Sequence, residues 1–102
     1  MIGCAVRVIA LSTLRDFWRK HPLAQVPLRS WYAEACRATW KSPAEVKQAH
    51  RSASFVAGDR VVFNIKGNDY RLIVAIRYRK QIMYICFIGT HREYDMIDAA
   101  TV

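Results

Sequence analysis

Apolar residues recur with two different periods along the chain, and the change of period separates a helical part from a strand-rich part. Up to about residue 50 they share faces at spacings of three and four residues, which is typical of α-helices. From Val61 onward the period becomes two, which is typical of strands. One short strand is predicted ahead of the helices, over residues 5–10, because β-branched residues alternate there with Arg7. The pattern predicts an α+β fold.

Two of the three predicted helices are recognised from their ends. The first follows a cap at Ser12 or Thr13 and stops at His21, since the residue before a proline disfavours helical geometry. Another brief helix, or a single helical turn, begins after Ser42, which starts a capping box that Glu45 completes.

The longest predicted helix begins near Pro27, because proline favours the first turn of a helix. Its apolar side chains form one stripe at helical spacing, made up of Leu28, Trp31, Tyr32, Ala35 and Cys36. An aromatic stripe could stack on bases, but helical spacing already explains it as packing against a sheet. We therefore expect this helix to cover one face of the sheet.

Three strands follow one another closely in the second half of the chain, over residues 61–65, 70–79 and 82–88. The third is apolar throughout, which predicts a central strand that is covered on both faces. Residues 91–97 are expected to form a last helical turn. Most of the sheet therefore comes from this half of the chain.

The turn between the first two of these strands, over residues 66–69, predicts a hairpin in which Gly67 and Asn68 supply positive φ values. In the strand after it, one set of side chains is expected in the core: Tyr70, Leu72, Val74, Ile76 and Tyr78. The opposite set consists of Arg71, Ile73, Ala75, Arg77 and Arg79. Because Ala75 is small, this second face is expected to leave room for an anionic group.

Composition and charge restrict the kind of protein. The 102 residues suffice for one domain, and the 53% that are hydrophobic spread along the whole chain, which excludes a disordered protein. The 16 Lys and Arg residues against 8 Asp and Glu give a net charge of +8. Because both halves carry this excess, a folded surface is expected to present it to a polyanion: RNA, DNA or an acidic protein.

Cysteine usage and apolar runs predict a cytoplasmic protein. Cys4, Cys36 and Cys86 are odd in number and far apart, which argues against a disulfide framework and a zinc site, so reduced core thiols are expected. The longest apolar run, residues 82–88, is too short to cross a bilayer, and the N-terminus lacks a signal-peptide pattern. Neither a metal nor a cofactor is predicted.

A cluster of candidate catalytic side chains is predicted at one end of the sheet. Asn64 and Lys66 share strand parity, and Arg71 leaves the partner strand close to the same turn. His91 and Tyr94 follow the last strand, and they return close to Arg71 if that strand pairs beside the strand of Arg71. One basic concavity would then hold all five residues.

These groups suit the cleavage of RNA without a metal ion. The reaction needs one group to deprotonate the 2′-hydroxyl, another to protonate the leaving 5′-oxygen, and fixed positive charge around the phosphorus. His91 could make either proton transfer, because histidine titrates near neutral pH. Arg71 and Lys66 could clamp the phosphate. Tyr94 could stack on an extruded base or take part in proton transfer.

Each of these residues also has a purely structural explanation. His91 could cap the last helical turn, and Tyr94 could be a core residue. The arginines at positions 71, 77 and 79 could form an ordinary solvated strand face. Periodicity and charge leave these alternatives open.

Two blocks of the sequence together resemble the HigB toxins of bacterial toxin-antitoxin pairs, a branch of the RelE-like superfamily. The first block is Val62-Phe63-Asn64-Ile65-Lys66-Gly67-Asn68-Asp69-Tyr70-Arg71-Leu72, and the second is Gly89-Thr90-His91-Arg92-Glu93-Tyr94-Asp95. The resemblance extends from Arg7 over nearly the whole chain and includes Trp31-Tyr32-Ala33-Glu34, Trp40-Lys41-Ser42-Pro43 and Ser54-Phe55. Two such blocks in this order and spacing are specific.

The resemblance implies a compact RelE-like α/β domain with a twisted, mainly antiparallel sheet and two or three helices packed on it. It implies a messenger RNA interferase, an endoribonuclease that cuts messenger RNA in the ribosomal A site without a metal. Attack by the 2′-hydroxyl would leave a 2′,3′-cyclic phosphate. The implied partners are ribosome-bound messenger RNA and a helix-turn-helix antitoxin, which neutralises an otherwise monomeric toxin in a hetero-oligomer.

The resemblance also implies roles for residues of this chain. The expected catalytic residues are His91, Arg71 and Tyr94. The residues expected to contact RNA or its phosphates come from the hairpin strands and the turns that follow them: Lys66, Asn64, Arg77, Arg79 and Lys80. That implication favours the catalytic interpretation of His91 over a cap.

Two other functions share some of these features. A RelE/ParE-fold toxin could act on DNA gyrase instead, although it would need no nuclease site, and a non-enzymatic basic module could bind RNA or DNA through charge alone. The whole of 1–102 is predicted to be a single toxin domain in which residues 1–5 are an extension. Such an extension would arise if translation started at a GTG codon for position 6.

Overall fold

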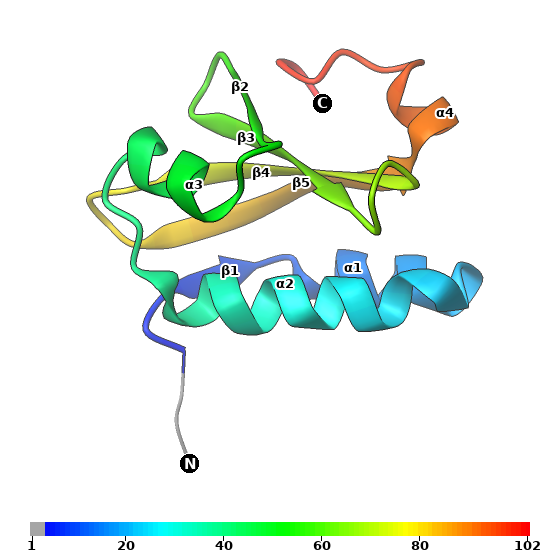
Figure 1. Ribbon diagram of the computed structural model, residues 1–102, viewed down its shortest axis with the longest axis horizontal. Coiled ribbons are helices and arrows are strands. Elements are labelled where there is room, and N and C mark those ends of the chain that lie inside the picture. Colours follow the sequence, from blue (N-terminus) through cyan, green and yellow to red (C-terminus); the bar gives the residue numbers. More distant parts are fainter. Residues whose placement is uncertain (1–3) are drawn as a thin grey trace.

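Residues 4–102 are described in a computed structural model, and five strands form one sheet in the order β1-β5-β4-β3-β2 (Figure 1). β1 (Arg7–Ile9) runs parallel to β5 (Ile82–Thr90). The other neighbours are antiparallel: β5 with β4 (Tyr70–Arg77), β4 with β3 (Arg60–Ile65), and β3 with β2 (Ser54–Val56). The predicted α+β fold with a mainly antiparallel sheet is confirmed.

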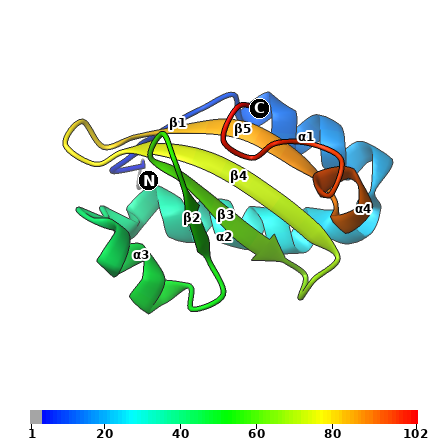
Figure 2. The ribbon, with the colours of Figure 1, turned by 90° about the horizontal axis from the view of Figure 1, so that it is seen from above.

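Two helices lie against one face of this sheet, and two short ones lie at its margins (Figures 1 and 2). α1 (Leu11–Lys20) continues through the 3₁₀ turn η1 (Pro22–Ala24) into α2 (Gln25–Ala38). α3 (Pro43–Ala49) lies near β2, and α4 (His91–Tyr94) directly follows β5. In the part of the chain from residue 4 onward, no helix combines the length and apolar character needed to span a bilayer.

The main core fills the space between the sheet and the helices. Its fully buried side chains include Leu14 of α1, Leu28 of α2, and Phe63 and Leu72 of the sheet. The ring of Phe63 meets that of Trp31 at 5.4 Å between centroids, so the predicted stripe of α2 packs on the sheet. The packing interpretation of that aromatic stripe is therefore confirmed.

The helix starts differ from the predicted ones. α1 begins at Leu11 after Ala10, whose φ of 70° provides the turn, so Ser12 and Thr13 lie inside the helix and the predicted cap is wrong. α2 begins at Gln25 because η1 leads directly into it. The cap of α3 is confirmed, since the side chain of Ser42 accepts a hydrogen bond from the backbone of Glu45.

The turn between β3 and β4 and the pairing of β5 also differ from the predicted ones. The positive φ values of the turn belong to Lys66 and Gly67, and not to Gly67 and Asn68. In β5 the pairing skips Cys86, because Ile85 pairs with Val74 and Phe87 with Ile73. Because of this extra residue, the core-facing side chains of β5 have odd residue numbers before the bulge and even ones after it.

The bulge explains the continuous apolar run of β5 better than coverage on both faces does. Met83 and Ile85 are buried in the core before the bulge, and Ile88 packs on the same core after it. Tyr84, on the opposite face, is 38% exposed. β5 is an interior strand as predicted, but the prediction that both of its faces are covered is wrong at Tyr84, and β4 holds the central place.

The second face of the sheet has less free space than the alternation of β4 predicts. Ile73 is fully buried there, and Ala75 is only 6% exposed. The C-terminal segment crosses above the sheet (Figures 1 and 2), and the guanidinium of Arg60 donates to the backbone oxygens of Ala99 and Val102. The prediction that an anion could approach the sheet at Ala75 is therefore wrong.

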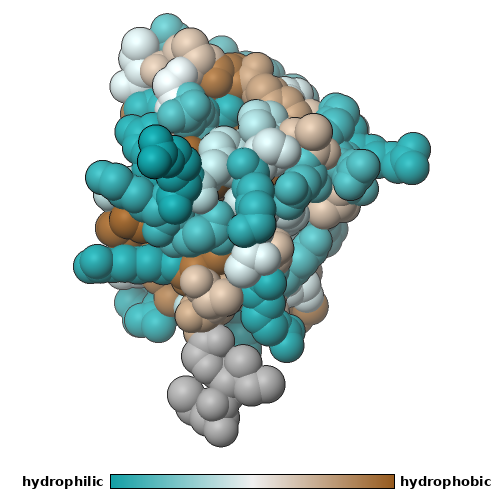
Figure 3. Space-filling model, turned by 90° about the vertical axis from the view of Figure 1, so that its left-hand side faces the viewer, coloured by the Kyte–Doolittle hydropathy of each residue, from teal (hydrophilic) through white to brown (hydrophobic). Residues whose placement is uncertain are grey.

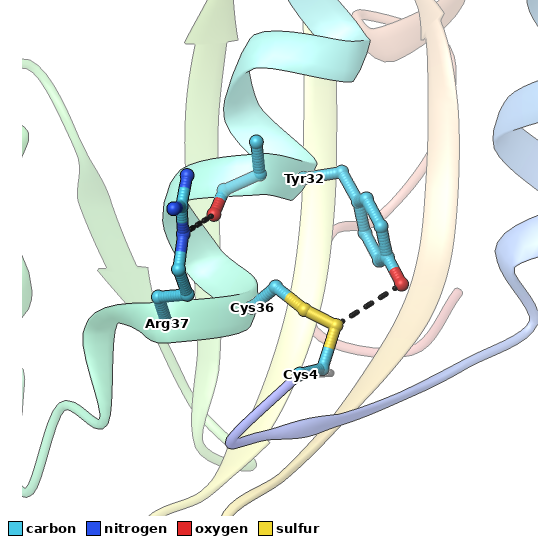
Figure 4. The surroundings of a disulfide bond; sticks show 5 residues. Cys4, Tyr32, Cys36 and Arg37 are labelled. Carbon is cyan, nitrogen blue, oxygen red and sulfur yellow. Dashed lines mark hydrogen bonds between the residues drawn. A yellow bond between two sulfur atoms is a disulfide. The ribbon is translucent and has the colours of Figure 1, made fainter. Parts of the chain in front are cut away.

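A disulfide joins Cys4 to Cys36 (Figure 4), so of the three predicted reduced core thiols only Cys86 is free, and it is partly exposed and lies outside the core. The backbone amides of Ala5 and Val6 both donate to the carbonyl of Cys36, and the Cα atoms of the two cysteines lie 4.8 Å apart. Part of the predicted extension, residues 4 and 5, is thereby attached to the end of α2. Residues 1–3 of that extension lie outside the described residues.

Replacing Phe63 by Ala should lower the free energy of unfolding by about 3–5 kcal/mol, because a ring that is 1% exposed would leave a cavity under the helices. Urea denaturation followed by circular dichroism measures the loss. Phe55, which is 40% exposed on β2, is the matched control, and its replacement by Ala should cost far less. Equal losses in the two variants would contradict this description of the core.

Candidate active site

The β3–β4 hairpin and the start of α4 meet at one end of the sheet. Arg71 pairs with Asn64 across β3 and β4, and with Gly89 across β4 and β5. The backbone amide of His91 donates to the carbonyl oxygen of Asp69, at 3.1 Å, in the hairpin turn. These pairings bring the predicted residues of the hairpin and of α4 to the same end of the sheet.

A capping box starts α4 and positions the side chains that follow. The hydroxyl of Thr90 accepts from the backbone amide of Glu93, and the carboxylate of Glu93 accepts from the backbone amide of Thr90 at 2.8 Å. Thr90 is therefore the cap, and the alternative that His91 caps this turn is wrong. His91 is the first residue of the helix, and Tyr94 lies three residues further on the same side.

The imidazole of His91 is half-exposed, and one of its nitrogens is held by a carboxylate. Nδ1 of His91 lies 3.1 Å from Oδ2 of Asp95, one helical turn later. When Nδ1 carries the proton and donates to Asp95, Nε2 is the unprotonated nitrogen of the ring. Sequence reasoning gave no role to Asp95, although its spacing of four residues from His91 is the signal for such a pair.

Arg71 and Tyr94 contact each other beside this histidine. Cζ of Arg71 lies 5.8 Å from the centre of the Tyr94 ring, within the range of a cation–π interaction. Nη1 of Arg71 donates to the carbonyl of Asn68 at 3.2 Å, which fixes one side of the guanidinium. Tyr94 is partly exposed, so the alternative that it is a core residue is wrong. Within residues 4–102 the other guanidinium N–H groups donate no hydrogen bond, so they can bind an anion.

Lys66 and Asn64 supply further polar groups at the hairpin. Nζ of Lys66 lies 2.9 Å from Oδ2 of Asp69, and this hydrogen bond with its charge attraction raises the pKa of Lys66. Lys66 is consequently a cation at neutral pH. Asn64 is partly exposed on the same strand. The end of the sheet thus combines two cations with one imidazole.

The remaining predicted RNA-contacting residues lie at the other end of β4. Arg77 forms an ion pair with Asp59 at 3.1 Å, and it lines a cleft of about 370 Å³ together with Arg79 and Lys80. Arg77 lies six positions along the extended strand from Arg71, which is a distance of about 20 Å. The hydrophilic side chains at this end of the molecule, on the left in Figure 1, dominate the view in Figure 3.

That cleft also contains aromatic side chains. Tyr78 and Tyr84 line it with the basic residues, and burial raises the pKa of Tyr78. The two basic areas are separate surfaces: one contains Tyr94, and the other contains Tyr78 and Tyr84. Across residues 4–102, no group of three or more His, Cys, Asp or Glu residues gathers as metal ligands would.

The chain is similar to toxins of known families. A family model described as HigB toxin, the RelE-like toxic component of a toxin-antitoxin system, matches residues 24–97. The mRNA interferase toxin HigB of Escherichia coli K12 is 28% identical over 96 residues, which cover 92% of both chains. The proteins named mRNA interferase HigB from Escherichia coli O157:H7 and Shigella flexneri match with the same identity and coverage. Every residue of the cluster lies inside the span that the family model matches.

A methyl group at position 89 should disturb the start of α4. A Cβ atom there would lie 2.5 Å from the ring of Phe87 and 3.0 Å from the carboxylate of Glu93. We expect Gly89→Ala to cost about 1–3 kcal/mol of stability, measured by thermal denaturation, and to shift the NMR signals of the His91 ring.

The double variant Gly89→Ala/Phe87→Ala tests the cause of that loss. Removing the ring makes room for the new methyl group, so the two changes together should destabilise the protein by less than the sum of the single changes. Strict additivity would show that the close approach to Phe87 is not what requires glycine.

Proposed function

The chain belongs to the HigB family of RelE-like toxins, and we propose that it is an endoribonuclease that cuts messenger RNA on the ribosome. The observation that carries the proposal is the placement of His91 and Arg71 on adjacent elements, tied by the hydrogen bond from His91 to Asp69. A proton-transfer group and a fixed cation at one end of a sheet are what phosphodiester cleavage requires.

In the proposed reaction the 2′-oxygen attacks the adjacent phosphorus and the bond from phosphorus to the 5′-oxygen breaks. The 2′-hydroxyl gives up its proton to a base, and the leaving 5′-oxygen takes a proton from an acid. The products are a 2′,3′-cyclic phosphate and a 5′-hydroxyl. His91 makes one of these transfers, with Asp95 holding its ring, and the reaction proceeds without a metal.

The surrounding side chains act on the phosphate and the base. Arg71 and Lys66 neutralise the charge that develops on the phosphorane, and Arg71 can do so with two N–H groups. Tyr94 stacks on an extruded base or takes part in proton transfer, and its contact with Arg71 supports either role. Asn64, opposite Arg71 in the register, contacts the RNA beside the scissile bond.

Arg77, Arg79 and Lys80 bind a different part of the RNA. Their position about 20 Å along β4 from Arg71 separates them from the reacting phosphate. Their cleft, with its tyrosines, suits a backbone phosphate and a stacked base. The two ends of the sheet would then hold the messenger, or the messenger and ribosomal RNA, together.

The partner proposed from family membership is an antitoxin with a helix-turn-helix domain, which neutralises the toxin in a hetero-oligomer in the cytoplasm. The net charge of +8 supports an acidic partner surface as well as RNA. Without the antitoxin, the toxin is proposed to be a monomer.

Replacing His91 or Arg71 by Ala should abolish growth inhibition after induction in cells and leave binding to the antitoxin intact. Primer extension on messenger RNA should then lose the cleavage stops that the unchanged protein produces. Arg15, which is exposed on α1 and lines a cleft with Arg29 and Tyr32 of α2, is the control, and Arg15→Ala should stay toxic. Full toxicity of both site variants, or uncut messenger with a DNA-damage response typical of gyrase poisons, would refute the proposal.

A messenger RNA with a 2′-O-methyl group at the scissile nucleotide should resist cleavage, because the attacking oxygen has no proton to lose. The unmodified messenger, bound to the same ribosomes, should be cut to a fragment that ends in a cyclic phosphate. Gel analysis with and without acid treatment, which opens the cyclic phosphate, measures both results. Cleavage of the methylated site would mean that water, and not the 2′-oxygen, attacks phosphorus.

A further inference from the structure

A second polar cleft adjoins the candidate active site at the free edge of β3. β2 pairs only with residues 60–62 of β3, so the stretch around Asn64 has no strand beyond it among residues 4–102. The side of α2 faces this edge, and a cleft of about 210 Å³ lies between them. Its polar lining consists of Ser30, Trp31, Glu34, His50, Asn64 and Lys66.

Two buried nitrogen atoms in this lining have unused hydrogen-bonding capacity. Trp31 is only 4% exposed, yet its indole Nε1 finds no acceptor within the described part of the chain. Leaving such a buried donor unpaired costs about 1–3 kcal/mol. Nε2 of His50 is buried as well, and it lies 3.2 Å from Oε2 of Glu34 without making a directed hydrogen bond.

The cleft is lined from rigid elements. The ring of His50 packs edge-on against Phe63 at 5.0 Å and against Trp40 at 5.7 Å, which fixes its position next to Glu34. The indole of Trp31 is held against Phe63 in the same way. A hydrogen-bond donor and a carboxylate acceptor thus stand one helical turn apart on α2, at positions that the core determines.

Lys66 and Asn64 connect this cleft to the candidate active site. Both residues line the cleft, and Asn64 pairs with Arg71 in the register. Lys66 binds Asp69, whose carbonyl accepts the amide of His91. A nucleotide that places its phosphate at Arg71 therefore has this cleft beside it.

We propose that the cleft binds one nucleobase with an exocyclic amino group, from the nucleotide next to the scissile phosphate. The inference rests on the proposed ribonuclease function. The carboxylate of Glu34 would accept from the amino group, and Trp31 would donate to the neighbouring ring nitrogen or carbonyl. The volume fits a single base, since it is below the roughly 300–1,000 Å³ of pockets for drug-sized ligands. Uracil has a carbonyl in place of the amino group, so its oxygen would be repelled by the carboxylate of Glu34 instead of donating to it.

Binding of nucleotides to the full-length chain tests the cleft without any cleavage. The three tryptophans give three indole N–H signals in an NMR spectrum, and the variant Trp31→Phe identifies the signal of Trp31. Cytidine and adenosine 5′-monophosphate should shift this signal at concentrations about tenfold below those that uridine 5′-monophosphate requires. No shift with either nucleotide, or equal shifts with all three, would overturn the inference.

The variant Glu34→Gln tests the acceptor, because an amide can both accept and donate. Its preference for cytidine over uridine monophosphate should fall by about tenfold, towards no preference. Asp16→Asn removes the same charge from an exposed position on α1 and should leave the preference unchanged. An unchanged preference in Glu34→Gln would contradict the role of the carboxylate.

Cleavage of ribosome-bound messengers that differ in one nucleotide beside the cut site separates this inference from the proposed function. The unchanged protein should cut the sites with cytosine or adenine faster than those with uracil, and Trp31→Phe and Glu34→Gln should reduce that difference. Cleavage with the same site preference in these variants and in the control Trp18→Phe would overturn the base-binding inference alone. Nucleotide binding at Trp31 without any cleavage would uphold it and overturn the proposed function.

Discussion

The pairing of β4 with β3 on one side and β5 on the other is the interaction on which the rest of the structure depends. This register places Arg71 between Asn64 and Gly89, and it buries Leu72 against the helices. Because β4 is bonded along both edges, its ends cannot shift relative to its neighbours without breaking many backbone hydrogen bonds at once. The position of Arg71 in the proposed active site is therefore fixed by a strand that is paired along both of its edges.

Strand alternation and helix stops predicted most of the fold. The three strands of the second half and the longest helix are where periodicity places them, because their apolar positions face a single core. β2 was missed, since three largely exposed residues, Ser54–Val56, carry no period. The start of α1 was misplaced because Ala10 adopts a positive φ, which no side-chain pattern reveals. The cover over Ala75 depends on contacts between Arg60 and the C-terminal segment, which are distant in sequence.

The candidate site was predictable to the extent that it is local. The tight hairpin turn brought Arg71 close to Asn64, and the segment after β5 returned His91 to the hairpin as expected. The support of His91 by Asp95 was overlooked, although it is a contact within one helical turn. The cleft between α2 and the edge of β3 could not be foreseen, because Glu34 and His50 meet only through tertiary packing. Arg77 shares a face of β4 with Arg71 but lies at the other end of the strand, so a shared face alone does not place two residues in one site.

The bulge at Cys86 lies in the strand that leads into α4 and His91. Deleting this one residue would let Phe87 follow Ile85 directly, and the two would still pair with Ile73 and Val74 of β4. Ile88 would stay opposite Leu72 and Gly89 opposite Arg71, so the deletion would remove the bend and extra twist of the bulge without changing which side chains face the core. The extra residue at Cys86 therefore affects the direction in which β5 leads into α4 and His91, while the burial pattern of the strand does not depend on it.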